Sequence, residues 1–324
     1  MAKAIRLHST GGPDVLRLEE VDVPPPGPGE AQVRHTAIGV NFVDTYHRTG
    51  LYPLAMPSGL GVEGAGVVER VGAGVSHVRP GERVAYAGGP PGSYSVVRNL
   101  PADRLVRIPD GISDRDAAAA MLKGLTVWAL VRRTHPVQRG ETVLWHAAAG
   151  GVGLIAVQWL KAIGATVIGT AGSDEKAELA RRHGCDHVVV YTREDFPKRV
   201  RELTGGVGVP VVYDSVGKAT FEGSLDSLRP LGLMVTFGNA SGPIPPVDML
   251  ALNRRGSLFI TRPSVFHYVQ RREDLEAGTA ELFALLGAGT LKIRVGQTWP
   301  LAEAAEAHRT LEARRTTGCA LLLP

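Results

Sequence analysis

The first third of the chain carries its hydrophobic residues in short segments bounded by Gly and Pro. Ala31–Ala37, Gly66–Val71 and Arg83–Ala85 are rich in Val and Ala and predict β-strands. The run Pro24–Gly29 cannot lie in a helix or a central strand, because proline lacks an N–H and fixes its own φ. Strand-like sequence flanks this run on both sides, which favours a rigid surface turn. Frequent turns between short strands predict a compact, barrel-like domain.

The pattern changes near Ser113, a residue suited to cap the N-terminus of a helix. Ala- and Leu-rich sequence from Asp116 to Leu130 predicts that helix. Segments of strand and helix character then alternate, which predicts a parallel, doubly wound sheet with helices on both faces. The predicted strands are Val143–His146, Thr166–Thr170, His187–Val190, Val209–Asp214, Leu233–Phe237 and Ser257–Thr261, and the helices between them are Val152–Ile163, Asp174–His183, Glu194–Leu203 and Ala219–Leu228. Two helices after Pro263, Arg272–Leu286 and Leu301–Thr310, lie outside this alternation and are expected to return to the first domain.

A glycine-rich turn, Ala147–Gly153, lies between a predicted strand and a predicted helix. Dinucleotide-binding turns follow the pattern G-x-G-x-x-G, whose three positions are held here by Ala148, Gly150 and Gly153. Small residues allow the backbone to approach a pyrophosphate, and the helix N-terminus presents N–H groups with partial positive charge. The turn therefore predicts a dinucleotide site.

The end of the second strand of this unit indicates which dinucleotide is bound. NAD-specific sites place an acidic residue there to bind the ribose 2′-OH, whereas this strand ends in small residues that include Gly172 and Ser173. Asp174 is better placed as the cap or first-turn residue of the next helix. Lys176 lies within reach of a 2′-phosphate, although an ordinary solvated lysine is the alternative. The pattern favours NADPH.

Composition and charge narrow the class of protein. At ~150 residues per domain, 324 residues indicate about two domains. The net charge is +4 with no block of like charges, so a nucleic-acid partner is not expected. Two cysteines exclude a disulfide framework and a Cys-rich zinc site. No apolar run of ~18 residues and no leader-like N-terminus are found, so a cytoplasmic protein without a membrane partner is expected.

Several motifs spread over the whole chain belong together. They are Asn41–Tyr46 with Arg48, Gly50 and Tyr52 following, Gly61–Val68, Lys123–Thr126, Ala147–Gly153, Tyr213–Gly217 and Phe237–Asn239. In combination they resemble the quinone oxidoreductase (zeta-crystallin) branch of the medium-chain dehydrogenase/reductase superfamily, and within it the bacterial NADPH:quinone reductases. The resemblance implies an α/β protein with a GroES-like β-rich barrel domain, 1–122 and 264–324, and a doubly wound Rossmann parallel-sheet domain, 123–263.

Departures from the zinc enzymes of that superfamily affect the expected chemistry. Val62 and Asn41 stand at two of their zinc-ligand positions, and valine cannot bind a metal. We therefore expect neither a catalytic nor a structural zinc. Alcohol oxidation is disfavoured without a Lewis acid, whereas a quinone is already electrophilic. Glu63 has the chemistry of a general base but, by the resemblance, lies near the lost metal position and can equally be structural; Asp44 is similarly ambiguous.

The resemblance implies an NADPH:quinone oxidoreductase and a set of site residues. Near the quinone oxygen it places Asn41, Tyr46, Tyr52 and Arg262, for which packing or pairing with a carboxylate is the alternative. As cofactor-binding residues it implies Asn41, Thr126, Ala148, Gly150, Gly151, Val152, Gly153, Gly172, Ser173, Lys176, Tyr191, Ser215, Phe237, Gly238 and, from the other domain, Arg314.

Other functions stay open at this stage. Reduction of the C=C bond of an enal or enone uses a similar electrophilic acceptor, and a crystallin-like or RNA-binding role for an NADPH-binding protein belongs to another class. The sequence leaves open the physiological quinone, one- or two-electron transfer, and whether any residue donates a proton. The apolar strand Ser257–Thr261 would be a sheet edge, which predicts a homodimer formed by pairing of two such edges.

Overall fold

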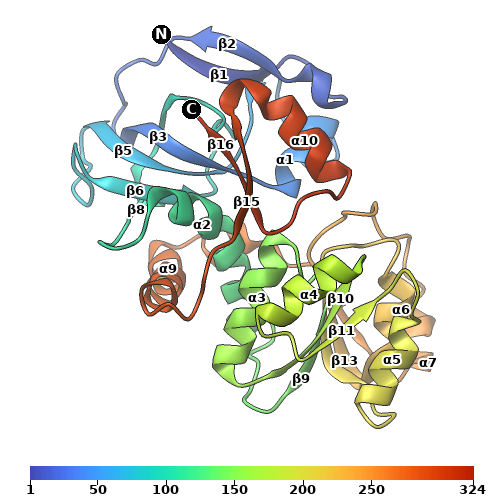
Figure 1. The fold of residues 1–324 in the computed structure, drawn as a ribbon. Helices are drawn as coiled ribbons and strands as arrows, with labels where there is room; N and C mark the ends of the chain where they lie inside the picture. Colours follow the sequence, from blue (N-terminus) through green and yellow to red (C-terminus); the bar gives the residue numbers. More distant parts are fainter. The chain divides into compact units, whose positions relative to one another are not determined.

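A computed structural model describes all residues, 1–324, and divides into two compact units (Figure 1). The barrel unit comprises Met1–Leu125, Val269–Gly289 and Ile293–Pro324. The Rossmann unit comprises Thr126–Tyr268 and Thr290–Lys292. The unit boundaries expected from the sequence are 122/123 and 263/264. Packing in the structure places these two boundaries at 125/126 and 268/269.

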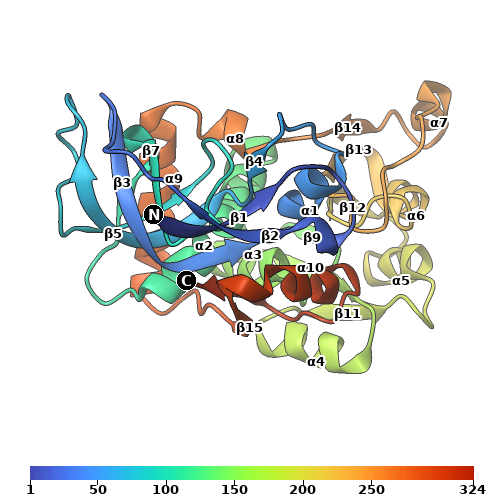
Figure 2. The same ribbon diagram turned by 90° about the horizontal axis from the view of Figure 1, so that it is seen from above.

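A seven-stranded sheet forms the centre of the barrel unit, in the order β15-β16-β3-β5-β6-β8 with β7 also paired to β3. All neighbours are antiparallel except β15 and β16, and β16 brings the C-terminus alongside β3. A smaller sheet has the order β2-β1-β4 (Figure 2). The strands are β1 Ala2–Leu7, β2 Arg17–Val21, β3 Glu30–Val40, β4 Ser58–Gly59, β5 Glu63–Val71, β6 Arg83–Ala87, β7 Val97–Pro101, β8 Val106–Arg107, β15 Val295–Pro300 and β16 Cys319–Leu323.

Helices of the barrel unit cover this sheet. They are α1 Phe42–Thr49, α9 Arg272–Gly287, α10 Ala304–Glu312 and the first part of α2 Asp114–Trp128, with short turns η1 Pro13–Val15, η2 Ala102–Arg104 and η4 Leu301–Glu303. α10 lies beside α1 (Figure 1) and contributes Ala304, Ala307 and Leu311 to a core that includes Ile38 and Leu322 of the sheet. The C-terminal segments thus complete the first unit, as the charged helices after Pro263 predicted.

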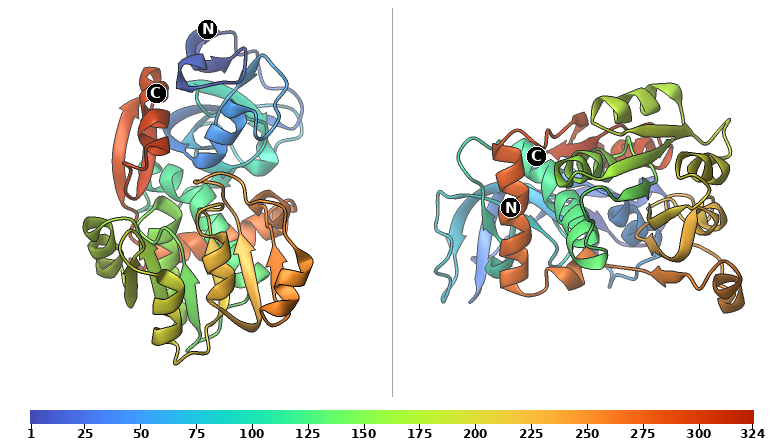
Figure 3. Two further views of the ribbon diagram at one scale, coloured as in Figure 1. Left: turned by 90° about the vertical axis from the view of Figure 1, so that its right-hand side faces the viewer. Right: turned by 90° about the horizontal axis from the view of Figure 1, so that it is seen from below.

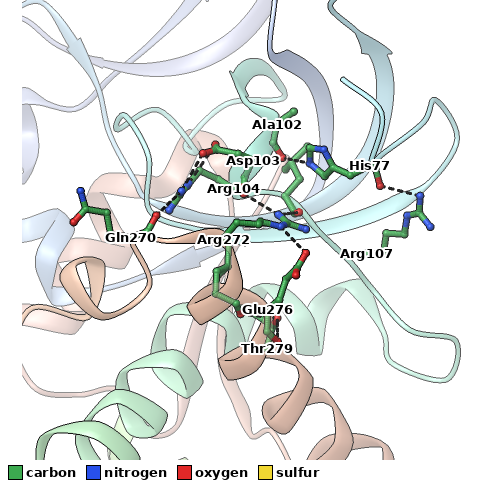
Figure 4. Close-up of polar contacts among 11 residues, drawn as sticks. His77, Ala102, Asp103, Arg104, Arg107, Gln270, Arg272, Glu276 and Thr279 are labelled. Carbon is green, nitrogen blue, oxygen red and sulfur yellow. Dashed lines mark hydrogen bonds and ion pairs between the residues drawn. The ribbon is translucent and has the colours of Figure 1, made fainter. Parts of the chain in front are cut away.

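Two arginines anchor the chain where it re-enters the barrel unit (Figure 4). Arg104, in η2, donates to the carbonyls of Val269 and Gln270 at 3.0 and 2.9 Å. Arg272, in α9, donates in the opposite direction, to the carbonyls of Asp103 and Leu105 at 2.8 and 2.7 Å. This reciprocal arrangement satisfies backbone carbonyls at both segments and fixes the start of α9 against η2.

The Rossmann unit contains a six-stranded, all-parallel sheet in the order β11-β10-β9-β12-β13-β14. α3 packs on α4, and α5 packs on α6, with helices on both faces of the sheet (Figure 3). The elements are η3 Ala129–Thr134, β9 Thr142–Trp145, α3 Gly151–Ile163, β10 Thr166–Ala171, α4 Asp174–Arg182, β11 His187–Val190, α5 Phe196–Leu203, β12 Val209–Asp214, α6 Phe221–Asp226, β13 Leu228–Thr236, α7 Met249–Arg254, β14 Phe259–Thr261 and α8 Val265–Tyr268. The predicted fold class, a GroES-like unit plus a doubly wound parallel sheet, is confirmed.

Some predicted elements differ from the observed ones. Leu228, predicted as the end of a helix, pairs with Val209 and begins β13 instead, because it belongs to the buried face of the sheet. Ser257 has φ +56° and precedes β14 rather than lying in it. The predicted helix Leu301–Thr310 begins as a short 3-10 turn, and α1 was not predicted at all. No helix of the structure is long and apolar enough to cross a membrane.

Candidate active site

The N-terminus of α1 in the barrel unit holds the first group of predicted site residues. Asn41 is the N-cap of α1, and its backbone N–H donates to Asp44 Oδ2 at 2.8 Å. The side-chain amide of Asn41 donates to Glu63 Oε2 at 2.9 Å. Both contacts are buried, so the Asn41 amide is held in one orientation.

Glu63 is the centre of a buried polar cluster. Its Oε2 also accepts from Lys123 Nζ at 3.0 Å, and its Oε1 accepts from the backbone N–H of Leu122 at 2.6 Å. Burial opposes the charged form of Lys123, but the attraction and hydrogen bond of Glu63, together with the charges of Cys319 and Asp44, outweigh it, and the pKa of Lys123 is raised. Three donors, from Asn41, Lys123 and the Leu122 backbone, therefore satisfy the carboxylate within the protein, and Glu63 is a counter-ion rather than an available base. Of the two readings of Glu63, the geometry favours the structural one.

A second buried chain of hydrogen bonds begins at Asp44. Tyr94 Oη donates to Asp44 Oδ2 at 2.9 Å and lies 3.0 Å from Nε2 of His308, which is in α10. Burial raises the pKa of Asp44 to about 7, and burial lowers the pKa of His308 to about 3. Tyr94 has one hydroxyl proton, which it donates to Asp44 in a hydrogen bond. Nε2 of the neutral His308 is therefore the donor to Tyr94 Oη. Asp44 Oδ1, His308 Nδ1 and two nitrogens of the buried Arg48 have no partner there.

The predicted tyrosines lie on and just beyond α1. The rings of Tyr46 and Tyr52 meet edge to face with centroids 5.3 Å apart, and the Tyr52 N–H donates to the Tyr46 carbonyl at 3.0 Å. Arg314 follows the C-terminus of α10 with φ +57°. The barrel unit thus groups Asn41, Tyr46 and Tyr52 in one segment, and its α10 carries the chain to Arg314.

The glycine-rich turn of the Rossmann unit has the geometry expected for a phosphate site. α3 begins at Gly151, and its N-cap Gly150 supplies no side-chain hydrogen bond to the first turn. The first N–H groups of a helix lack intrahelical partners, so those of Gly151 and Val152 are available to an anion. A Cβ on Gly153 would lie 2.3 Å from the Ala147 carbonyl, which explains why only glycine fits where α3 meets the turn.

A buried hydrogen-bond network lies under this turn. The sequence did not predict it, because His146 there is an isolated histidine with no recognisable partner. His146 follows β9, and its ring nitrogens contact Thr170 Oγ1 and Ser224 Oγ at 2.9 Å each. Ser224 in turn donates to Asp214 Oδ2 at 3.0 Å. Burial lowers the pKa of His146. The carboxyl ends of β9, β10 and β12 are thereby tied together, and Asp214 accepts from the N–H of Val216 in the next loop at 2.7 Å.

The loops after β10 and β11 carry the residues predicted to bind the 2′-phosphate. Ser173 caps α4, and its Oγ accepts from the Lys176 N–H at 3.3 Å, which places Lys176 in the first turn as predicted. A Cβ on Gly172 would lie 2.8 Å from Tyr191 Oη, so the Tyr191 hydroxyl lies over the end of β10. Tyr191 and Lys176 therefore belong to adjacent segments.

The loop after β13 holds Phe237 and Gly238. A Cβ on Gly238 would lie 2.4 Å from the Ser215 carbonyl, so this loop packs closely on the loop after β12. Arg262, after β14, donates to Thr236 Oγ1 and to the Gly238 carbonyl at 3.0 Å each. Arg262 therefore supports the Gly238 loop through its hydrogen bonds to a carbonyl and a hydroxyl. Thr126 begins the part of α2 that belongs to the Rossmann unit.

No group of three or more His, Cys, Asp or Glu side chains in the structure is arranged to hold a metal ion. Val62 is buried at the start of the β5 region, and Asn41 and Glu63 are hydrogen-bonded to each other. These residues do not make a zinc-ligand set.

A GroES-like unit joined to a parallel Rossmann unit with a glycine-rich turn between β9 and α3 defines a dinucleotide-dependent dehydrogenase/reductase of the medium-chain superfamily. Residues 27–110 match the alcohol dehydrogenase GroES-like domain, and residues 151–284 match the zinc-binding dehydrogenase family. The chain belongs to the quinone oxidoreductase family of that superfamily. It is 53% identical over the full length of both chains to the quinone oxidoreductase of Pseudomonas aeruginosa.

The names of two further relatives state a cofactor or a substrate. The crystal structure of the Escherichia coli quinone oxidoreductase complexed with NADPH superimposes with a TM-score of 0.98, at 49% identity and 100% coverage of both chains. The 2-haloacrylate reductase of a Burkholderia species is 48% identical over 100% of this chain and 99% of its own.

Proposed function

We propose that this protein is an NADPH-dependent quinone reductase that works without zinc. The observation that carries the proposal is the state of Glu63, whose carboxylate is satisfied by Asn41, Lys123 and the Leu122 N–H. With Val62 beside it, this segment offers one occupied carboxylate where a metal needs three or four free ligands. The ammonium group of Lys123 is a fixed positive charge beside the Glu63 carboxylate.

The residues present fit NADPH. The uncapped N-terminus of α3 suits a pyrophosphate, and the small residues Gly172 and Ser173 leave room at the end of β10. Lys176 and Tyr191 supply an ammonium group and a hydroxyl for the 2′-phosphate. The E. coli relative bound to NADPH supports this choice.

NADPH supplies a hydride, and reduction of a quinone to a hydroquinone needs that hydride and one proton. The role proposed for Asn41, Tyr46 and Tyr52 is to orient and polarise the acceptor carbonyl, since developing negative charge on oxygen is stabilised by fixed donors. Asn41 is suited to this because its amide is already fixed by Glu63. Arg262 is assigned a positioning role for the Gly238 loop.

Steady-state oxidation of NADPH with 1,4-benzoquinone and 9,10-phenanthrenequinone tests the proposal. We expect turnover with both quinones and a much lower kcat/KM with NADH. Absence of quinone-dependent NADPH oxidation by the folded protein would refute it.

A second candidate function is reduction of an activated C=C bond, favoured by the full-length similarity to a 2-haloacrylate reductase. Both acceptors are conjugated electrophiles that accept a hydride. Assays with 2-chloroacrylate and a 2-alkenal beside the quinones separate the two, because the preferred acceptor has the higher kcat/KM.

A homodimer is also part of the proposal. β14 is the last strand of the six-stranded sheet, and Phe259 on it is 58% exposed. Pairing of two β14 edges would cover that side chain and the unpaired backbone groups of the strand.

A further inference from the structure

Two charged side chains beside the expected 2′-phosphate side form an exposed, bidentate ion pair. Asp174, the first residue of α4, accepts from Arg193 with Nη1–Oδ2 and Nη2–Oδ1 distances of 2.6 Å each. The Arg193 side chain is 58% exposed and that of Asp174 is 64% exposed. Hydrogen bonding to Arg193 lowers the pKa of Asp174, so the carboxylate is ionised at neutral pH.

The pair joins the same two loops that carry the phosphate-side residues. Asp174 directly follows Gly172 and Ser173, and Arg193 lies two residues after Tyr191. The Tyr191 N–H donates to the Ala171 carbonyl at 3.2 Å, so the loop after β11 lies along the end of β10. An ion pair between these loops is therefore close to any group bound at Gly172.

A carboxylate near the end of the second strand has a definite consequence for cofactor choice. Such a group repels a 2′-phosphate and accepts a hydrogen bond from the 2′-OH of NAD(H). Asp174 lies only two residues beyond Gly172, and a bare carboxylate there would counteract Lys176. The Arg193 guanidinium cancels that charge and still has N–H groups that Asp174 does not use.

We infer that Arg193 is a specificity-determining residue, which favours NADPH over NADH by neutralising Asp174 next to the 2′-phosphate. This inference rests on the proposed use of NADPH. An exposed ion pair contributes little to stability, so the role of this one is in the local charge.

Dissociation constants of NADPH and NADH, measured by calorimetric titration of the full-length protein, test the inference. Arg193→Met exposes the Asp174 charge and should weaken NADPH about tenfold, or ~1.4 kcal/mol. NADH should not weaken. The double variant Asp174→Asn/Arg193→Met removes both charges and should return the NADPH affinity to within about threefold of the parent, or ~0.7 kcal/mol. The difference between variants should shrink at ~1 M salt, where charges are screened within ~3 Å.

Arg199→Met is the matched control, because Arg199 is an exposed arginine of the same unit paired with Glu202 at 2.8 Å. It should leave both affinities unchanged. Equal loss of NADPH and NADH in Arg193→Met would show a structural role and overturn the inference. Failure of the double variant to recover would overturn it too, since Arg193 would then bind the phosphate itself. A parent protein without preference for NADPH refutes the proposed cofactor, whereas an NADPH affinity that is unchanged in Arg193→Met refutes only this inference.

Discussion

The ammonium group of Lys123 lies 3.0 Å from the carboxylate of Glu63, and both side chains are almost completely buried in the barrel unit. Removing two charges from water is costly, and their attraction compensates only when the remaining polar atoms are also satisfied. Here Asn41 and the Leu122 N–H complete the set on Glu63. The ion pair thus fixes the orientation of a predicted site residue, Asn41.

Breaking this pair should destabilise the protein strongly. Lys123→Met leaves the Glu63 charge buried without its counter-ion, which typically costs ~3–5 kcal/mol. The double variant Glu63→Gln/Lys123→Met removes both charges and should recover a large part of that loss. Denaturant unfolding measures both values. A Lys123→Met variant as stable as the parent would contradict the buried pairing.

The protein should purify without stoichiometric zinc and keep its reductase activity in the presence of a chelator. Val62 cannot coordinate a metal, and Asn41 and Glu63 are committed to each other and to Lys123. Elemental analysis together with NADPH oxidation in EDTA provides the check. About one zinc per chain, with activity lost to the chelator, would contradict the proposal.

The Asp44–Tyr94–His308 chain predicts opposite pH dependences for two variants. The folded pKa of Asp44, about 7, is above its ordinary value of 3.8, so its stabilising contribution is present below pH ~4 and lost as pH rises to ~7. The folded pKa of His308, about 3, is below 6.5, so its contribution is present above pH ~6.5 and lost as pH falls to ~3. In the parent protein the two slopes partly cancel between pH ~4 and ~6.5.

Asp44→Asn should therefore make the free energy of unfolding rise more steeply with pH than in the parent between pH ~4 and ~6.5. His308→Gln should shift the slope in the opposite direction, and each change is at most ~1.4 kcal/mol per pH unit. Urea unfolding at several pH values gives these slopes. Slopes equal to that of the parent in both variants would show that neither group titrates as its surroundings imply.

The strand–helix alternation and the glycine turn were readable from the sequence because they depend on local spacing. Every predicted strand of the Rossmann unit exists, and Lys176 lies in the first turn of α4. The buried pairs were not readable in the same way. Glu63 and Lys123 are 60 residues apart, and Tyr94 and His308 are 214 apart, so only the tertiary packing of helices and strands brings them together.

A lysine in an Ala-rich helix has the local pattern of a solvated residue, so the sequence alone indicates Lys123 only as part of the Lys123–Thr126 motif. The small strands at the chain ends were missed for a related reason. β15 and β16 are held mainly by pairing with each other and with β3, so their local sequence carries little signal. Arg193 was missed because an exposed arginine after a strand has no distinctive pattern until its partner is known.

Replacement of Lys176 tests the cofactor assignment. A charge-assisted hydrogen bond is worth ~1.5–3 kcal/mol, so Lys176→Ala should weaken NADPH by about 10- to 150-fold. NADH lacks the phosphate and should be almost unaffected. Titration of both cofactors measures this. An equal loss for both would mean that Lys176 supports the fold, and no change for either would leave it a solvated lysine.

The edge strand β14 should mediate a homodimer, and one charge placed on it should dissociate the dimer. Phe259 is 58% exposed on the last strand of the sheet, and Met249 and Leu250 of α7 are 72% and 66% exposed. In a two-fold pairing of β14 strands, Phe259→Asp would bring two carboxylates into the same interface and desolvate them.

Val207→Asp is the control, because Val207 is also 58% exposed but lies after α5, away from β14 in the chain. Light scattering at micromolar concentration should show a dimer for the parent and the control and a monomer for Phe259→Asp. A monomeric parent, or a Phe259→Asp variant that stays dimeric, would exclude β14 as the interface.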